Sequence, residues 1–66
     1  MERVEILLLE LGVLKREHRE LDDVIKALQE MPGSDRLKIQ RLKKNKLLLR
    51  DRIANLEDQI TPDIIA

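Results

Sequence analysis

Apolar residues recur along the first half of the chain at alternating steps of three and four. The series consists of Val4, Leu7, Leu11, Leu14, Leu21, Ile25 and Leu28, and His18 stands at the one step where a further apolar residue is due. A heptad pattern of this kind places all its members on one side of an α-helix. Residues 2–30 contain no proline, so the pattern predicts one long helix over residues 2–30.

The same spacing resumes in the second half of the chain. Its members are Ile39, Leu42, Lys46, Leu49, Ile53, Leu56 and Ile60, and Lys46 is the polar exception. Pro62 disfavours helical backbone at the residue before it. The pattern therefore predicts a second helix over residues 35–61 and a short tail over residues 62–66.

The segment MPGSD, residues 31–35, separates the two series. Pro32 stops a helix, and Gly33 tolerates the left-handed backbone of a tight turn. Ser34 or Asp35 can cap the next helix by accepting hydrogen bonds from its free N–H groups. We therefore predict a turn over residues 31–35.

Folding the chain at this turn brings the two series together layer by layer. A loop centred between Gly33 and Ser34 places Leu11 opposite Leu56 and Leu14 opposite Ile53. Each layer then matches an a position with a d position, as an antiparallel pair requires. We predict an all-α fold, a single domain over residues 1–66 that forms an antiparallel two-helix coiled-coil hairpin. One continuous helix is the alternative, although the turn sequence disfavours it.

Two polar residues interrupt the predicted seam in adjacent layers, His18 and Lys46. A polar residue in a seam fixes the register at a cost in stability, and Lys46 can bury its stem while its ammonium reaches Glu17, Glu20 or Asp22. A ligand pocket at these layers is one alternative. A metal site is another, because His18 and Asp22 are four residues apart on a helix, although this spacing suits an ordinary pair equally well. We expect register control, with no metal and no cofactor.

The composition includes few of the side chains that enzymes use for catalysis. The 66 residues include no Cys, Phe, Tyr or Trp, and the hydroxyl-bearing side chains are Ser34 and Thr61. Disulfides and thiolate metal sites are thereby excluded, and no glycine-rich phosphate loop is present. We expect no deep concave site between the helices, no catalytic residues and no enzymatic activity.

Further apolar side chains fall outside the seam, namely Ile6, Leu8, Leu9, Val13, Leu47 and Leu48. A two-helix hairpin leaves them in water, and a chain of this length is marginal as a monomer. We predict self-association into a dimer or tetramer, most simply a two-fold four-helix bundle that buries these residues. A hydrophobic contact with another protein is the alternative. Insertion at a membrane surface comes third, because the glutamates of the first ten residues repel anionic lipid.

Charge is unevenly distributed, although the formal net charge is zero. Residues 36–52 carry eight basic residues and one acidic residue, whereas residues 1–30 carry five basic and eight acidic residues. The basic helix can simply complement the acidic one. The functional alternative is non-specific contact with a nucleic-acid backbone through Arg36, Arg41, Lys43, Lys44 and Arg50. Without aromatic side chains for base stacking, we consider nucleic acid the less favoured partner.

The chain gives no sign of export or membrane insertion. Its first residues are acidic where a secretory signal is basic, and no apolar run approaches the roughly 18 residues of a membrane span. We therefore expect a cytoplasmic protein.

The segments EHRELDDVIKALQ and RLKKNKLLLRDRI, joined by the Pro/Gly turn, resemble the YdcH-like family of short bacterial proteins. The resemblance covers residues 10–57 and rests on His18, Leu21, Asp22, Ile25, Leu28, Leu42, Lys43, Lys46, Leu47, Leu49, Arg50, Asp51 and Ile53. It implies a two-helix hairpin of bacterial cytoplasmic origin, and it implies that His18, Asp22, Lys46 and Asp51 belong to one feature of the fold. It implies no activity, so the expected role is a structural or protein-interaction module.

Overall fold

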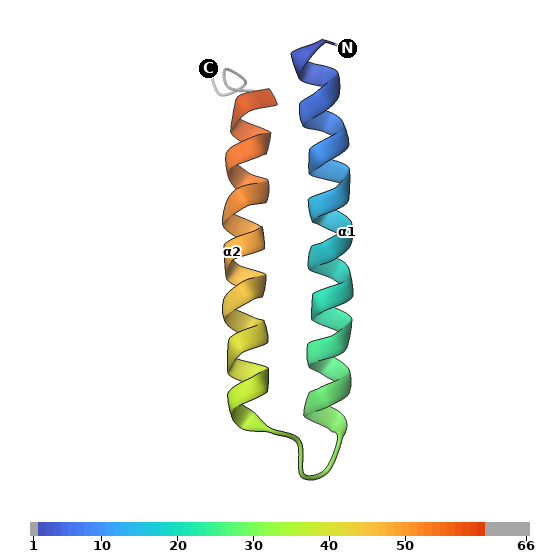
Figure 1. The fold of residues 1–66 in the computed structure, drawn as a ribbon, viewed down its shortest axis with the longest axis vertical. Helices are drawn as coiled ribbons and strands as arrows, with labels where there is room; N and C mark the ends of the chain where they lie inside the picture. The colour runs from blue at the N-terminus through green and yellow to red at the C-terminus, as the bar shows by residue number, and fades with distance from the viewer. Residues whose placement is uncertain (1, 61–66) are drawn as a thin grey trace.

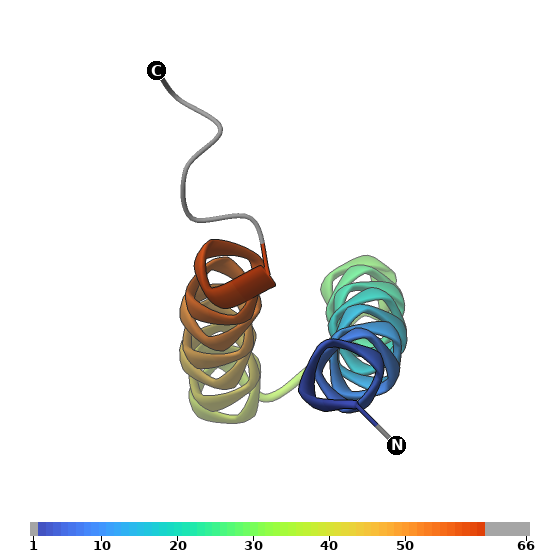
Figure 2. The same ribbon diagram turned by 90° about the horizontal axis from the view of Figure 1, so that it is seen from above.

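The protein folds into two long helices that lie side by side in opposite directions (Figure 1). The structure is a computed structural model that describes residues 2–60. Helix α1 spans Arg3–Glu30 and helix α2 spans Arg36–Ile60. Seen from above, they form two adjacent columns joined by the loop at the far end (Figure 2). The predicted all-α antiparallel hairpin is confirmed. The predicted tail over residues 62–66, like Thr61, lies outside the described residues.

The end of α1 follows from the proline two residues later. Met31 has extended backbone, with φ −82° and ψ 128°, and its N–H donates to the carbonyl oxygen of Leu28 at 3.2 Å. Pro32 requires this extended conformation in the residue before it. Gly33 then takes φ +77°, a left-handed conformation that a residue without Cβ adopts at no steric cost. The chain reverses here because these three residues exclude helix.

The start of α2 is capped by Asp35. Its carboxylate Oδ1 accepts the backbone N–H of Leu37 at 2.9 Å and that of Lys38 at 3.4 Å. Two of the four N–H groups that a helix start leaves unpaired are thereby satisfied. The sequence offered Ser34 or Asp35 as the cap, and Asp35 fills the role.

The seam between the helices lies where the heptad pattern predicted it. All its positions except Val4 are buried or half-buried, and the most buried are Leu11, Leu14, Ile25 and Leu56. Leu11, Leu14 and Leu56 form one core cluster, against which Leu7, Leu49, Ile53 and Ile60 pack. This is the grouping that the predicted layers require. The core therefore concentrates toward the end of the hairpin that holds the chain termini.

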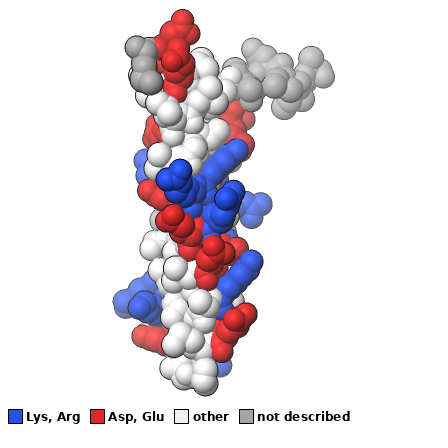
Figure 3. Space-filling model, turned by 90° about the vertical axis from the view of Figure 1, so that its right-hand side faces the viewer, with Lys and Arg blue, Asp and Glu red and all other residues white. Residues whose placement is uncertain are grey.

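The six apolar residues outside the seam are all exposed. Their exposed fractions run from 49% at Ile6 to 59% at Leu47. Viewed from the α1 side, uncharged atoms dominate the upper third of the surface below an acidic tip, and charged side chains gather from the middle downward (Figure 3). Four of the six, Ile6, Leu8, Leu9 and Val13, lie at the end where the core is best formed.

Candidate functional site

An open groove runs between α1 and α2 on one face of the hairpin, with a volume of about 930 Å³. No deep concave site was expected from the sequence, and the concavity seen here is open to solvent. The groove lies beside the seam at the level of its polar layers. Its lining includes six basic side chains, which are Lys15, Arg19, Lys26, Lys43, Lys46 and Arg50. The acidic side chains of the lining are Asp22 and Glu57.

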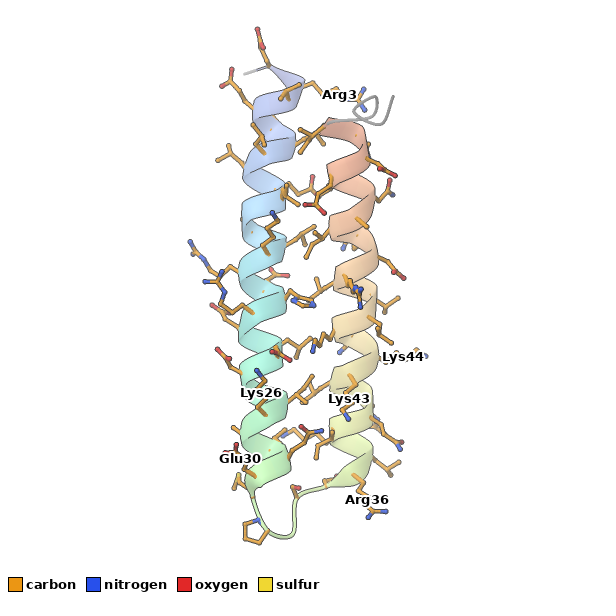
Figure 4. The ribbon with its side chains drawn as sticks, turned by 180° about the vertical axis from the view of Figure 1, so that it is seen from behind. Arg3, Lys26, Glu30, Arg36, Lys43 and Lys44 are labelled. Carbon is orange, nitrogen blue, oxygen red and sulfur yellow. The ribbon has the colours of Figure 1, made fainter. Side chains whose placement is uncertain are left out.

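The basic side chains come from both banks of the groove. Figure 4 shows Lys26 of α1 and Lys43 of α2 projecting toward the viewer at nearly the same level. Lys44, one residue later on α2, extends sideways and away from α1. Successive residues differ by about 100° around a helix, so neighbours in the sequence face different surroundings here.

Asp22 is the carboxylate at the centre of the groove. Its Oδ1 accepts a hydrogen bond from Lys46 Nζ of the opposite helix at 2.5 Å, and its Oδ2 lies 3.2 Å from Lys26 Nζ. Hydrogen bonds from Lys46 first and Lys26 second lower the pKa of Asp22 from its ordinary value of 3.8. Both members of the cross-helix pair are about one-third exposed, so water screens the attraction and limits its contribution to stability.

The sequence offered Lys46 three acidic partners, and the heptad explains the selection of Asp22. Asp22 directly follows the seam residue Leu21, on the side where the groove lies. Glu17 directly precedes the seam residue His18, and its position in the heptad turns it toward the opposite side. Glu20 lies further out on that same opposite side. Lys46 therefore buries its stem in the seam and carries its ammonium out into the groove.

His18 lies in the floor of the groove and is half-buried. Its Nε2 is buried and has no hydrogen-bond partner among the described residues. The described contacts of Asp22 are with Lys46 and Lys26, and none of them is with His18. Within residues 2–60, no three His, Cys, Asp or Glu side chains gather as a metal site. The imidazole therefore lies beside the groove with a nitrogen that is unpaired among the described residues and shielded from solvent.

Asp51, which the resemblance grouped with His18, Asp22 and Lys46, is placed apart from them. It is exposed and does not line the groove, although its neighbour Arg50 does. The other three members come together: Lys46 binds Asp22, and His18 lies one helical turn before Asp22 on α1.

The six exposed apolar residues divide between two faces. Leu47 lines the groove, whereas Leu48 follows it by about 100° and turns toward the opposite face. Ile6 and Val13, one heptad apart, also occupy positions on the face away from the groove, with Leu9 next to them on the outer side of α1. The stripe of Ile6, Leu9 and Val13 is therefore separate from the groove.

The five basic residues predicted to contact nucleic acid are also distributed over more than one side of α2. Arg36, Lys43 and Arg50 follow at steps of seven, so they share one side, and Lys43 and Arg50 line the groove. Arg41 and Lys44 occupy other sides of the helix. All five are exposed.

Sequence reasoning missed the contribution of α1 to the groove. The missed residues are Lys15, Arg19 and Lys26. They lie in the half of the chain whose net charge is negative, so a count of charge by segment does not reveal them. Their place in the heptad could have identified them, because each of the three directly follows a residue of the seam. Lys15 and Asp22 on α1 occupy the same heptad position as Lys43 and Arg50 on α2, and those positions face each other in an antiparallel pair.

Comparison with known proteins was made by family and by individual chain. A family described as protein of unknown function (DUF465) matches residues 11–57. The chain belongs to this family. DUF465 is the YdcH-like family, so the resemblance read from the sequence is confirmed. No curated protein and no solved structure matches the chain. The DUF465 match contains every groove-lining residue but begins after Ile6, Leu8 and Leu9.

A membrane-spanning role was also tested on the described helices. Neither α1 nor α2 has a stretch that is long and apolar enough to cross a bilayer.

Proposed function

We propose that this DUF465 protein is a non-enzymatic, self-associating helical hairpin that acts as a structural or protein-interaction module. The observation that carries the proposal is the exposed stripe of Ile6, Leu9 and Val13, whose side chains are 49%, 58% and 56% exposed. These residues follow at steps of three and four, so they form one continuous apolar line on α1. The stripe lies on the face away from the groove.

The energetics of a small hairpin support association. The described residues include four buried side chains, a small core for a chain whose length makes a stable monomer difficult. Fully burying one large aliphatic side chain contributes about 1.5–3 kcal/mol. A two-fold arrangement buries the same stripe of both copies in one interface, which doubles the number of residues removed from water. The simplest product is a dimer that forms a four-helix bundle.

The experiment measures solution mass by sedimentation or light scattering over a range of protein concentrations. We expect a dimer or tetramer for the parent chain and a monomeric or unfolded chain for the double variant Ile6→Asp/Leu9→Asp. The matched control is Gln40→Asp/Asn45→Asp, which adds the same two charges at exposed positions of α2. We expect the control to keep the parent mass. A parent that stays monomeric at high concentration refutes self-association and directs the search to a partner protein.

Non-specific nucleic-acid binding is the second candidate, and one observation favours it. Arg36, Lys43 and Arg50 form a basic line along one side of α2, and no carboxylate lies within ion-pair distance of them among the described residues. Contact with three phosphates predicts that log K falls with log salt at a slope of about −2.7 for duplex DNA. Fluorescence anisotropy with a short duplex measures this slope. Absence of binding at low salt removes the candidate.

A further inference from the structure

The charges in the groove do not balance. Of its two carboxylates, Asp22 is bound by Lys46 and Lys26, and Glu57 lies 3.6 Å from Lys15 Nζ. These contacts account for three of the six basic side chains. Arg19, Lys43 and Arg50 remain, and the described residues provide no carboxylate within ion-pair distance of them. Three cations that converge on one groove without anions create a positive potential that attracts anionic ligands.

Two of these three cations lie on opposite banks at the same level. The Lys46–Asp22 pair fixes the alignment of the helices. Arg50 lies one turn beyond Lys46 on α2, and because the helices are antiparallel, the matching residue one turn before Asp22 on α1 is His18. Arg19 follows His18 directly and lines the groove. Arg19 and Arg50 therefore line the groove at the level of His18, one from each helix.

We propose that this groove is a binding site for a phosphate-bearing small molecule, held by Arg19 and Arg50 above the His18 imidazole. The planar guanidinium group donates pairs of parallel hydrogen bonds that match two oxygens of a phosphate. The Nε2 of His18 is buried and has no partner among the described residues, so it donates to a further oxygen once the imidazole turns toward the groove, in the tautomer or charge state that carries a proton there. Lys43 supplies a third cation in the same groove, at the level of Lys26.

The shape and lining of the groove favour a small molecule over a polymer. Its volume of about 930 Å³ is within the range of small-molecule sites, about 300–1,000 Å³. The floor holds aliphatic side chains, Ile25 and Ile53, and the hairpin has no aromatic residue on which a nucleobase could stack. A compact anion with several phosphate oxygens meets more of the donors than an extended strand does. The stripe of Ile6, Leu9 and Val13, which carries the proposed self-association, does not line this groove.

The test uses inorganic pyrophosphate as the probe and the full-length protein at low ionic strength. Two-dimensional NMR follows the amide resonances, the arginine side-chain N–H groups and the imidazole of His18 during titration. We expect saturable shifts centred on Arg19, Arg50 and His18. The variants Arg19→Gln and Arg50→Gln are each expected to weaken the affinity roughly tenfold, because each removes a charge-assisted contact with the anion.

The matched controls are Arg16→Gln and Arg52→Gln, which remove the same charge at exposed positions that do not line the groove. We expect the controls to keep affinity within about twofold of the parent, since they lose only screened, long-range attraction. Equal weakening by the controls means that pyrophosphate responds to overall charge, and this result overturns the proposal. The absence of saturable shifts overturns it as well.

A second variant separates ligand contact from stability. His18→Leu restores an apolar residue to the seam, so we expect a higher melting temperature together with weaker pyrophosphate binding. A variant that is more stable and binds pyrophosphate unchanged removes His18 from the site. Binding to a short duplex, or to vesicles that contain phosphatidylglycerol, in the absence of any pyrophosphate binding also contradicts the proposal, because the ligand is then a polymer or a membrane surface.

Discussion

The terminal end of the hairpin and its middle differ in how their side chains are packed. At the end that holds the chain termini, Leu11, Leu14 and Leu56 form a continuous core cluster, and further apolar residues remain exposed around it. In the middle, His18 and Lys46 occupy the seam, and charged side chains line an open groove beside it. The first region has more apolar surface than one hairpin buries, and the second has more positive charge than its carboxylates neutralise.

One short seam can therefore be flanked by two surfaces of different chemistry, one apolar and one cationic. An apolar excess favours a partner that excludes water, whereas a cationic excess favours a partner that supplies negative charge. The DUF465 match contains the whole groove but begins at Leu11, after most of the exposed stripe. The terminal half and the polar half of the hairpin can therefore be altered by separate substitutions.

The largest effect is expected at the core of the terminal half. Leu14 is 7% exposed and belongs to the core cluster, so Leu14→Ala should cost about 2–5 kcal/mol through lost burial and a residual cavity. This is a large share of the stability of any small domain. Urea titration followed by circular dichroism measures the loss. The control Leu8→Ala truncates a side chain that is 50% exposed, and a cost as large as that of Leu14→Ala would contradict this account of the core.

The next effect is a gain of stability in the same half. Gly12 lies inside α1, and a Cβ added there meets no heavy atom within 4 Å. Gly12→Ala should stabilise the protein by about 0.5–1 kcal/mol, because alanine loses less backbone entropy in a helix. Thermal denaturation should show a rise of several degrees. Gly33→Ala is the control with the opposite sign, since φ is +77° at that residue and a side chain there is strained. A lower melting temperature for Gly12→Ala would contradict the prediction.

In the polar half, Lys46→Leu exchanges a partly exposed ion pair for an apolar seam residue. Apolar replacement of such a pair is often neutral or stabilising, so we expect the melting temperature to rise by a few degrees. Asp22 keeps its contact with Lys26 in this variant, which avoids an unpaired carboxylate. Sedimentation of the same sample shows whether the oligomeric state changes when the register residue is lost. A clear loss of stability would show that the cross-helix pair outweighs the apolar contact.

The smallest effect is the pH dependence that Asp22 contributes. Its pKa is lower in the folded protein than the ordinary 3.8 because Lys46 and Lys26 bind the carboxylate. The folded state therefore holds the proton less tightly than the unfolded state, and acid favours unfolding. The stabilisation is complete above pH 3.8 and is lost as the pH falls through the lower folded value. Urea midpoints of the parent and Asp22→Asn should converge in that window, and those of the parent and Asp23→Asn should show no such convergence.

The seam could be predicted from the sequence because spacing alone determines it. Residues that recur at steps of three and four must share one side of a helix, and the turn at Gly33 aligned the two series. Val4 is the exception, 48% exposed, because it lies beyond the last described layer, that of Leu7 and Ile60. The end of α1 lies two residues before Pro32, and α2 begins directly after Asp35, since both residues act locally.

The groove could not be predicted in the same way, because it depends on side chains from two helices and on their distances. The sequence offered Lys46 three carboxylates, and only the arrangement in space shows that Asp22 is reached. The unpaired Nε2 of His18 likewise appears only once the side chains are placed in space. Whether the chain self-associates depends on a second copy, which periodicity within one chain does not describe.

The position of the turn also bears on how the hairpin folds. Contacts beside the loop close a short length of chain and lose little entropy, whereas those at the other end close nearly the whole chain. We therefore expect pairing to start near Asp35 and to reach the layers of Leu11 with Leu56 and of Leu7 with Ile60 last. Fraying runs in the reverse order, so the first layers to open uncover the core cluster beside the exposed stripe. A partner that covers this end of the hairpin would slow unfolding at the step where unfolding begins.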